Sequence, residues 1–413
     1  MTVRASQVYI LMEFVSSLAN TIMFTTYALY YITTLGLNPF ELLLVGMVLE
    51  LTVLIFEGIT GVVADTYSRR LSVIAGMFAL GFGFALQGVI PWLDALGLAV
   101  PAIAWLLFSQ VVSGVGYTFI SGANKAWITD EIGEERVGRL FLRANRLSLV
   151  ATLIGIPVSV GLSVAGTHLP YLTGGLLYIG LGLFLILRMK ETGFVRPERE
   201  GPASPLREMT STWIAGAKAV RGQPILLMMV AVTVFGGAAS EGYDRLWEAH
   251  LITGIGFPAS PSMPMAVWFG IISALIAFLS LFVVRFAEKR LDVSNKRVVL
   301  VGMLVLTGLR IVAIASFALA PNFAWALGSL LAVGIIGTLS GPIYDTWLSL
   351  NIESKVRATV LSMLGQADAL GQTGGGPLVG WVGHRFTVRA SLLVAAALLS
   401  PILVVFTRAL RKR

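Results

Sequence analysis

The chain has 413 residues, of which 56% are hydrophobic and 13% are charged. A soluble globular domain carries about a quarter charged residues, so this composition indicates an integral membrane protein. The chain has no cysteine, which excludes disulfides, thiolate metal sites and cysteine nucleophiles, and its net charge of +8 raises the question of a polyanionic partner.

Apolar stretches of about 20 residues, long enough to cross a hydrocarbon core of roughly 30 Å, recur along the whole chain. They predict an all-α integral membrane protein with twelve transmembrane helices. The first stretch continues as a full span without a small-residue cleavage site, so we expect no cleaved signal peptide. The predicted spans are residues 7–34, 39–64, 71–92, 99–123, 140–165, 170–188, 223–251, 265–286, 297–319, 323–347, 357–382 and 389–408.

The distribution of basic residues indicates orientation. With the N-terminus inside, most of the 30 Lys and Arg fall in cytoplasmic segments, and the outer loops hold little beyond Arg385 and Arg389. This asymmetry is typical of multi-pass proteins of the cell membrane. We therefore expect both termini in the cytoplasm, and we attribute the positive charge to topology and not to nucleic acid.

Span one carries a polar stripe on an apolar helix. Glu13, Ser16, Ser17 and Asn20 follow one another at i, i+3, i+4 and i+7, so they share one helix face. Ionisable groups inside a bilayer are unfavourable and are seldom kept without a partner, a wet cavity or a task. We expect this face to line a central cavity.

Span two begins with the sequence NPFE, in which Asn38 is predicted to cap the helix and Glu41 to close a capping box. Deeper in the span, Glu50 and Glu57 lie seven residues apart on one face. Burial disfavours the charged form of a carboxyl group, and a second carboxylate nearby disfavours it further. Glu50 and Glu57 are therefore our leading candidates for reversible protonation.

The loop between spans two and three reads GVVADTYSRR, residues 61–70. Gly61, Asp65, Arg69 and Arg70 match, in order and spacing, the signature loop of the major facilitator superfamily, which this chain resembles. Thr66 stands where that loop usually has a basic residue, and Ser68 stands where it usually has glycine.

The charges of this loop are expected to form a cytoplasmic latch. Gly61 would allow close helix approach, and Asp65 would accept hydrogen bonds or sit at a helix N-terminus. Arg69 and Arg70 would pair with the acidic residues Asp130 and Glu131 at the end of span four.

The two halves of the chain repeat each other. The sequences SGANKAW at Ser121 and SGPIYDTW at Ser340 occupy equivalent places in spans four and ten, with an offset of about 220 residues. This offset predicts a parallel duplication. The resemblance implies two pseudo-symmetric six-helix bundles, residues 1–188 and 223–413, joined by a cytoplasmic linker, residues 189–222, with an amphipathic helix at 205–220.

The second half carries further intramembrane charges. In span seven, Glu241, Asp244 and Arg245 share a face with Glu248, and Glu241 and Arg245 have the favourable order for an ion pair. One arginine cannot neutralise three acids, so Asp244 or Glu248 could serve a proton or a cationic substrate. Alternatively, Glu248 lies at the outer interface and the pair is a gate strut.

Three more charges lie in later spans. Arg310 in span nine and Asp368 in span eleven could pair with each other, although span nine is usually peripheral in this fold, and Asp368 could instead serve the cavity. Asp345 in span ten is expected to join the latch.

Two glycine-rich sequences suggest a branch of the superfamily. GIPVSVG at Gly155 and GGGPLVG at Gly374 resemble a Gly-Pro motif typical of drug:proton antiporters, and the chain looks similar to the drug and macrolide efflux branches. Both sequences could instead be helix-packing surfaces.

The sequence gives little support to an enzyme. It has no Walker loop, HExxH or GxSxG, and its three histidines are scattered, so we expect no catalytic residues, no bound metal and no cofactor. The resemblance instead implies a secondary transporter, monomeric in the lipid bilayer, that exports amphipathic or cationic small molecules by alternating access, driven by protons. The alternatives are a metabolite or lipid carrier of the same superfamily and, from another class, a membrane receptor or scaffold that transports nothing.

Overall fold

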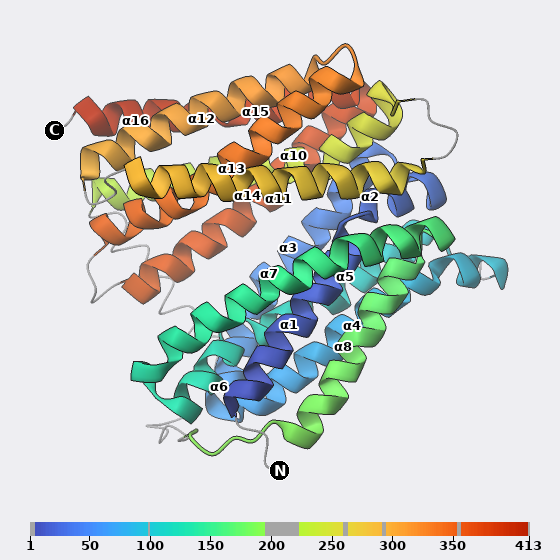
Figure 1. Ribbon diagram of the computed structural model, residues 1–413, viewed down its shortest axis with the longest axis vertical. Helices are drawn as coiled ribbons and strands as arrows, with labels where there is room; N and C mark the ends of the chain where they lie inside the picture. Colours follow the sequence, from blue (N-terminus) through green and yellow to red (C-terminus); the bar gives the residue numbers. More distant parts are fainter. Residues whose placement is uncertain are drawn as a thin grey trace. The chain divides into compact units, whose positions relative to one another are not determined.

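The computed structural model describes residues 5–97, 100–194, 223–258, 263–290, 295–352 and 357–411 (Figure 1). These residues are almost entirely helical. The first half contains α1 Ala5–Phe24, α2 Tyr27–Leu29, the π-helical turn η1 Tyr30–Thr34, α3 Pro39–Thr66, α4 Arg69–Ala95, α5 Ala102–Ile120, α6 Ala123–Ile132, α7 Glu134–Ala165 and α8 Leu169–Arg188. The second half contains α10 Pro224–His250, the π-helical turn η2 Leu251–Ile255, α11 Met265–Arg290, α12 Lys296–Ala318, α13 Phe323–Asn351, α14 Arg357–Arg385, α15 Val388–Leu398 and α16 Ser400–Arg411.

Within these ranges, 11 helical segments are long and apolar enough to cross a membrane. The remaining predicted span is α14, whose 29 residues have sufficient length but include many glycines together with Gln366, Asp368 and Gln372. With α14 included, the helices correspond to the twelve predicted spans of the all-α fold.

Two predicted spans, one and twelve, are broken rather than continuous. Span one ends its α-helix at Phe24 and resumes in α2 and η1. Span four, predicted to end at residue 123, ends its α-helix α5 at Ile120, and α6 begins after Gly122, whose φ of 72° favours glycine. Span twelve breaks before Ser400, because Pro401 has no N–H to continue the helix and its ring disfavours the preceding turn.

The capping box at the start of span two is confirmed. The Asn38 side chain accepts hydrogen bonds from the backbone N–H groups of Phe40 and Glu41, at 2.9 and 3.1 Å. The Glu41 carboxylate in turn accepts a hydrogen bond from the Asn38 N–H at 2.9 Å. The sequence NPFE therefore sets the start of α3 by local chemistry alone.

The helices form two compact units. Unit 1 comprises residues Met1–Gly36 and Leu51–Met209, and unit 2 comprises Leu37–Glu50 and Thr210–Arg413. The boundary near residue 209 falls in the predicted linker, of which residues 195–222, including the predicted amphipathic helix, lie outside the described residues. The first part of α3 groups with unit 2, whereas the predicted division assigned all of span two to the first half.

Each unit has its own packing order. In unit 1, α4 packs against α5 and α8, and α1 packs against α7 and α8. In unit 2, α10 packs against α14 and α15, and α12 packs against α13 and α16, as the ribbon colours of Figure 1 allow the reader to follow.

The local backbone repeats between the halves. Both η1 and η2 are five-residue π-helical turns, and each is followed by a glycine of positive φ, Gly36 at 68° and Gly256 at 78°. These glycines are 220 residues apart in the sequence, as are Trp127 and Trp347, which end the SGANKAW and SGPIYDTW motifs. A shared irregularity at the same offset supports the parallel duplication.

The glycines of α14 set the distance between α14 and α10. A Cβ placed on Gly375 would lie 2.5 Å from the Cα of Ala238, and one placed on Gly371 would lie 3.0 Å from the Cα of Val234. Gly155 in α7 approaches Thr21 of α1 in the same way, at 2.7 Å from its Cβ. Both glycine-rich sequences therefore include helix-packing positions.

Candidate functional site

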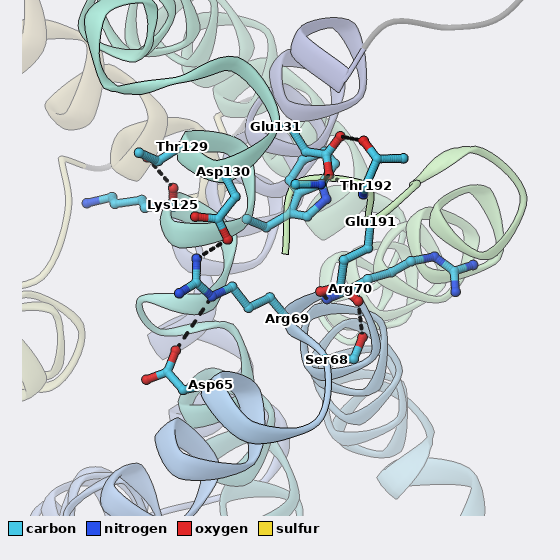
Figure 2. Close-up of polar contacts among 12 residues, drawn as sticks. Asp65, Ser68, Arg69, Arg70, Lys125, Thr129, Asp130, Glu131, Glu191 and Thr192 are labelled. Atoms are coloured by element: carbon cyan, nitrogen blue, oxygen red, sulfur yellow. Dashed lines mark hydrogen bonds and ion pairs between the residues drawn. The ribbon is translucent and has the colours of Figure 1, made fainter. Parts of the chain in front are cut away.

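The signature loop of unit 1 carries an ion-pair chain. Asp65, at the end of α3, lies 3.5 Å from the Nε of Arg69, the first residue of α4. Arg69 also forms an ion pair with Asp130 of α6 and lies over the ring of Phe194, 5.5 Å from its centroid. Figure 2 shows the guanidinium of Arg69 between the two carboxylates. The predicted contact between Arg69 and Asp130 is thus present.

A second carboxylate, that of Glu191, holds the start of α4. One oxygen accepts the Ser68 hydroxyl at 2.6 Å, and the other accepts the backbone N–H of Arg70 at 3.0 Å. Ser68 Oγ accepts in turn from the Leu71 N–H at 3.1 Å, so it caps α4. The serine that replaces the usual glycine of the loop is therefore part of this network, as Figure 2 shows.

The prediction that Arg70 pairs with Glu131 is wrong, because the Arg70 guanidinium points to the end of α8. It donates to the carbonyl oxygens of Met189 at 2.6 Å and Ile186 at 2.8 Å. Carbonyls at the C-terminal end of a helix lack intrahelical donors and attract a cation. Arg70 therefore caps α8.

Glu131 instead binds the segment that follows α8. Its carboxylate accepts the Thr192 hydroxyl at 2.7 Å and the Gly193 N–H at 2.8 Å. Trp127, one turn earlier in α6, donates its indole N–H to the Lys190 carbonyl at 2.7 Å. The segment after α8 is thereby tied to both α4 and α6.

Two further residues of the predicted latch lie outside this network. A Cβ on Gly61 would meet no described atom within 4 Å, and the close helix approach expected there stays a prediction. Asp345 is exposed on α13, in unit 2, and its place in a latch stays a prediction. Sequence reasoning missed Glu191, because an acidic residue among basic residues at the start of a linker resembles an ordinary solvated charge.

The junction between α5 and α6 places two donors on two intramembrane carboxylates of unit 1. Asn124 donates its side-chain amide to Glu13 of α1 at 3.1 Å, and Ser121 donates its hydroxyl to Glu57 of α3 at 3.0 Å. Lys125 adds an electrostatic attraction to Glu13. The SGANKAW motif thus connects the predicted candidates Glu13 and Glu57 to one short segment, the α5–α6 junction and the start of α6.

The remaining candidates of spans one and two are placed as follows. Asn20 accepts a hydrogen bond from the Tyr178 hydroxyl of α8 at 2.9 Å. Glu50 is half-buried on α3, seven residues before Glu57. Their roles in a central cavity stay predictions.

In unit 2, the predicted ion pair of α10 is present. The Arg245 Nε lies 3.0 Å from Glu241, which is only 5% exposed. A Cβ on Gly46 of α3 would overlap the Glu241 carboxylate, so the absence of a side chain there gives that carboxylate its space. Asp244 is attracted electrostatically by Arg310 of α12, so a second arginine contributes to the balance of the acids on α10.

A cavity of about 510 Å³ lies inside unit 2, between α10, α12, α13 and α14. Its volume is in the range of small-molecule sites. Asp368 and Arg310 both line it, together with the hydroxyls of Thr233, Thr307 and Tyr344. Asp368 accepts a hydrogen bond from Gln372 at 2.8 Å. The pairing of Arg310 with Asp368 that the sequence left open is not among the ion pairs of the described chain.

One contact of this cavity repeats a contact of unit 1. Thr233 and Tyr344 share a hydrogen bond of 2.6 Å. Thr233 lies 220 positions after Glu13, and Tyr344 lies 220 positions after Asn124. Glu13 and Asn124 are also hydrogen-bonded to each other. The duplicated helices therefore make a polar contact at equivalent positions in both units. In unit 1 it joins an amide to a carboxylate, and in unit 2 it joins two hydroxyls that line the cavity.

Comparison with solved structures shows the fold of transporters. The chain superposes on the nucleoside transporter NupG with a TM-score of 0.70 at 14% identity, over 100% of both chains. It superposes on a bacterial homologue of the human lysosomal transporter Spinster with a TM-score of 0.72 at 15% identity, over 98% of this chain and 96% of that one. At these identities the likeness concerns the fold alone.

Sequence comparison shows the family. The chain is 24% identical to the uncharacterized MFS-type transporter YxaM of Bacillus subtilis (strain 168), over 88% of this chain and 86% of the relative. The sequence model of the family described as Major Facilitator Superfamily matches residues 9–371 of this chain. The chain is a multi-pass membrane transporter that belongs to the major facilitator superfamily.

Proposed function

We propose that the chain is a proton-coupled secondary transporter that exports small amphipathic molecules carrying a cationic group. In this proposal the two units alternate access to the substrate, the protein works as a monomer in the cell membrane, and both termini and the signature loop face the cytoplasm. The basic residues of the loops support this orientation.

The observation that carries the proposal is the kind of partner that three intramembrane carboxylates have. Glu13, Glu57 and Asp368 are hydrogen-bonded to Asn124, Ser121 and Gln372, which are all neutral. No ion pair joins any of the three to Lys or Arg in the described ranges.

Neutral amide and hydroxyl partners suit reversible protonation. An amide or a hydroxyl donates to a carboxylate and, after rotation, accepts from a carboxylic acid, so both protonation states keep a hydrogen bond. A permanently charged arginine would instead favour only the ionised state. Glu241, which pairs with Arg245, is by this argument the weaker proton site.

The cavity of unit 2 supports the assignment of the cargo. Asp368 gives it a carboxylate, and Leu348, Leu361 and Leu364 give it an apolar wall, which together suit an amine on an apolar body. A metabolite carrier is the second candidate, and it is favoured by Arg310 in the same lining.

The test is substrate-evoked proton flux. The purified chain is reconstituted in liposomes with an internal pH-sensitive dye, and a panel of lipophilic cations is added to wild type, Glu13→Gln, Glu57→Gln and Asp368→Asn. We expect proton flux in wild type and its loss in at least one of the three variants. The control Glu134→Gln changes an exposed carboxylate at the start of α7 and should retain the flux.

Two results would contradict the proposal. Folded wild type that moves no proton with any compound would remove proton coupling and leave the metabolite carrier. Wild-type behaviour in all three variants would show that the neutral-partner carboxylates do not carry the proton.

Loss of substrate flux in a folded variant would exclude the alternative that the chain is a receptor or scaffold that transports nothing.

A further inference from the structure

We propose that the cavity of unit 2 binds a zwitterionic small molecule whose anionic end contacts Arg310 and whose cationic end contacts Asp368. This inference rests on the proposed transport function and narrows the class of its cargo. It assigns to Arg310 a recognition role that the position of span nine alone did not predict.

The first argument is that opposite charges line one cavity without neutralising each other. Arg310 comes from the middle of α12 and Asp368 from the middle of α14, and both line the space of about 510 Å³. The ion pairs found in the described chain do not include one between them. A ligand that carries both charges can therefore contact both side chains at once.

The second argument concerns the hydrogen bonds of Arg310. Its Nε is buried, and its N–H has no acceptor in the described part of the chain. Asp244 attracts the guanidinium electrostatically but leaves this N–H unmatched. A guanidinium presents its donors as a planar fork that fits a carboxylate, so an anionic group is the ligand chemistry that would complete it.

The third argument concerns Asp368. Gln372 donates a hydrogen bond to the Oδ2 of Asp368. Gly237 of α10 lies beside the Oδ1 of Asp368, and a Cβ on Gly237 would lie 2.7 Å from that oxygen. A neutral amide does not compensate a carboxylate charge, so an ammonium group with three donors suits the remaining acceptor positions. The hydroxyls of Tyr344 and Thr307 in the same lining can accept from such a group.

A ligand with a single charge would match only half of this site. An amine would leave the Arg310 N–H without an acceptor, and a carboxylate would leave Asp368 without a cation. A buried donor without an acceptor, or a buried carboxylate without a counter-charge, costs free energy. The remaining wall, which includes Leu361, Leu364 and Met303, favours an apolar connection between the two ends.

The experiment uses matched ligands and the purified full chain in detergent, without any gradient. The zwitterions are 4-aminobutanoate, 6-aminohexanoate and 8-aminooctanoate, each compared with the alkylamine and the alkanoate of the same chain length. Isothermal titration calorimetry measures the dissociation constants for wild type, Arg310→Gln, Arg310→Lys and Asp368→Asn. The chain-length series reports the spacing of the two charges.

We expect the best of the three zwitterions to bind wild type at least tenfold more tightly than both singly charged analogues of its length. Arg310→Gln should weaken the zwitterion at least tenfold and change the amine less than twofold. Asp368→Asn should weaken the zwitterion similarly and change the alkanoate less than twofold. Arg310→Lys, which keeps the charge but loses the planar fork, should fall between wild type and Arg310→Gln.

An amine that binds wild type as tightly as the zwitterion at every length would overturn the inference, as would the absence of binding by all three zwitterions. If Arg310→Gln does not fold, the wild-type ratios and Arg310→Lys decide. The two proposals fail separately: zwitterion preference without proton flux in liposomes removes the coupling and keeps the site, whereas proton flux evoked by cations without zwitterion preference removes only this inference.

Discussion

Tyr344 and Thr233 share a hydrogen bond of 2.6 Å in the lining of the cavity of unit 2, between α13 and α10. The equivalent bond of unit 1, 220 residues earlier, joins Asn124 to Glu13. The duplicated helices have thus kept one interhelical contact while its chemistry changed from an amide and a carboxylate to two hydroxyls. Glu13 is one of the three proton-site candidates proposed above, whereas Thr233 and Tyr344 line the proposed cargo cavity.

The Tyr344–Thr233 bond should be measurable by a double-mutant cycle. We expect Tyr344→Phe and Thr233→Val to be non-additive, with a coupling of about 0.5–1.5 kcal/mol, because either substitution alone removes the same bond. Thermal unfolding in detergent measures the effect. The control pair Tyr344→Phe and Thr407→Val should be additive, because the Thr407 hydroxyl donates to the Leu403 carbonyl of its own helix and has no other hydrogen bond among the described residues. Additivity of the first pair would show that the bond contributes nothing to stability.

The packing of α14 on α10 gives a matched pair of glycine substitutions. Gly375→Ala should destabilise unit 2 by about 1–3 kcal/mol, because the new methyl group would overlap the backbone of Ala238 and force the helices apart. Gly374→Ala, one residue earlier, should be tolerated, because nothing described lies within 4 Å of its Cβ. Thermal unfolding compares the two variants, and equal stability of both would contradict the close approach.

The hydrogen bonds of Glu191 predict that its substitution lowers the protection of the Arg70 amide against hydrogen exchange. Glu191→Gln should weaken both bonds at the start of α4 and lower stability by about 1–2 kcal/mol, because hydrogen bonds to a charged acceptor are stronger than those to a neutral one. Hydrogen exchange at the Arg70 amide should become faster. Glu135→Gln, an exposed carboxylate on α7, should leave this exchange unchanged. Unchanged exchange in Glu191→Gln would refute the role.

Gly46 should be required for the position of Glu241. Gly46→Ala should displace the Glu241 carboxylate and weaken its ion pair with Arg245, with a loss of about 1–3 kcal/mol. Adding Glu241→Asp, whose shorter side chain withdraws from the new methyl group, should restore part of this loss in thermal unfolding. Gly328→Ala, with no described atom within 4 Å of its Cβ, serves as the control. A Gly46→Ala protein as stable as the control would disprove the contact.

The sequence by itself determined the features that depend on local chemistry and on the bilayer. Hydrophobic length predicted the spans, the NPFE sequence predicted the capping box of α3, and the signature loop predicted the family and the Arg69–Asp130 contact. The offset of the SGANKAW motif predicted the duplication that Gly36 and Gly256 now mark in the backbone. Each of these signals lies within a few residues or follows from the solvent preference of a whole helix.

Apart from the Arg69–Asp130 contact, only the tertiary structure decided which distant polar groups meet. Glu191 lies more than 100 residues from Ser68, and periodicity does not reveal that the end of α8 returns to the start of α4. Asn124, Ser121 and Gln372 look like ordinary polar residues until helix packing places them on carboxylates. Arg310 was assigned to a peripheral span, but the rotation of α12 about its axis turns it to the cavity. Such rotations are set by side-chain packing between helices, and one helix sequence does not contain its neighbours.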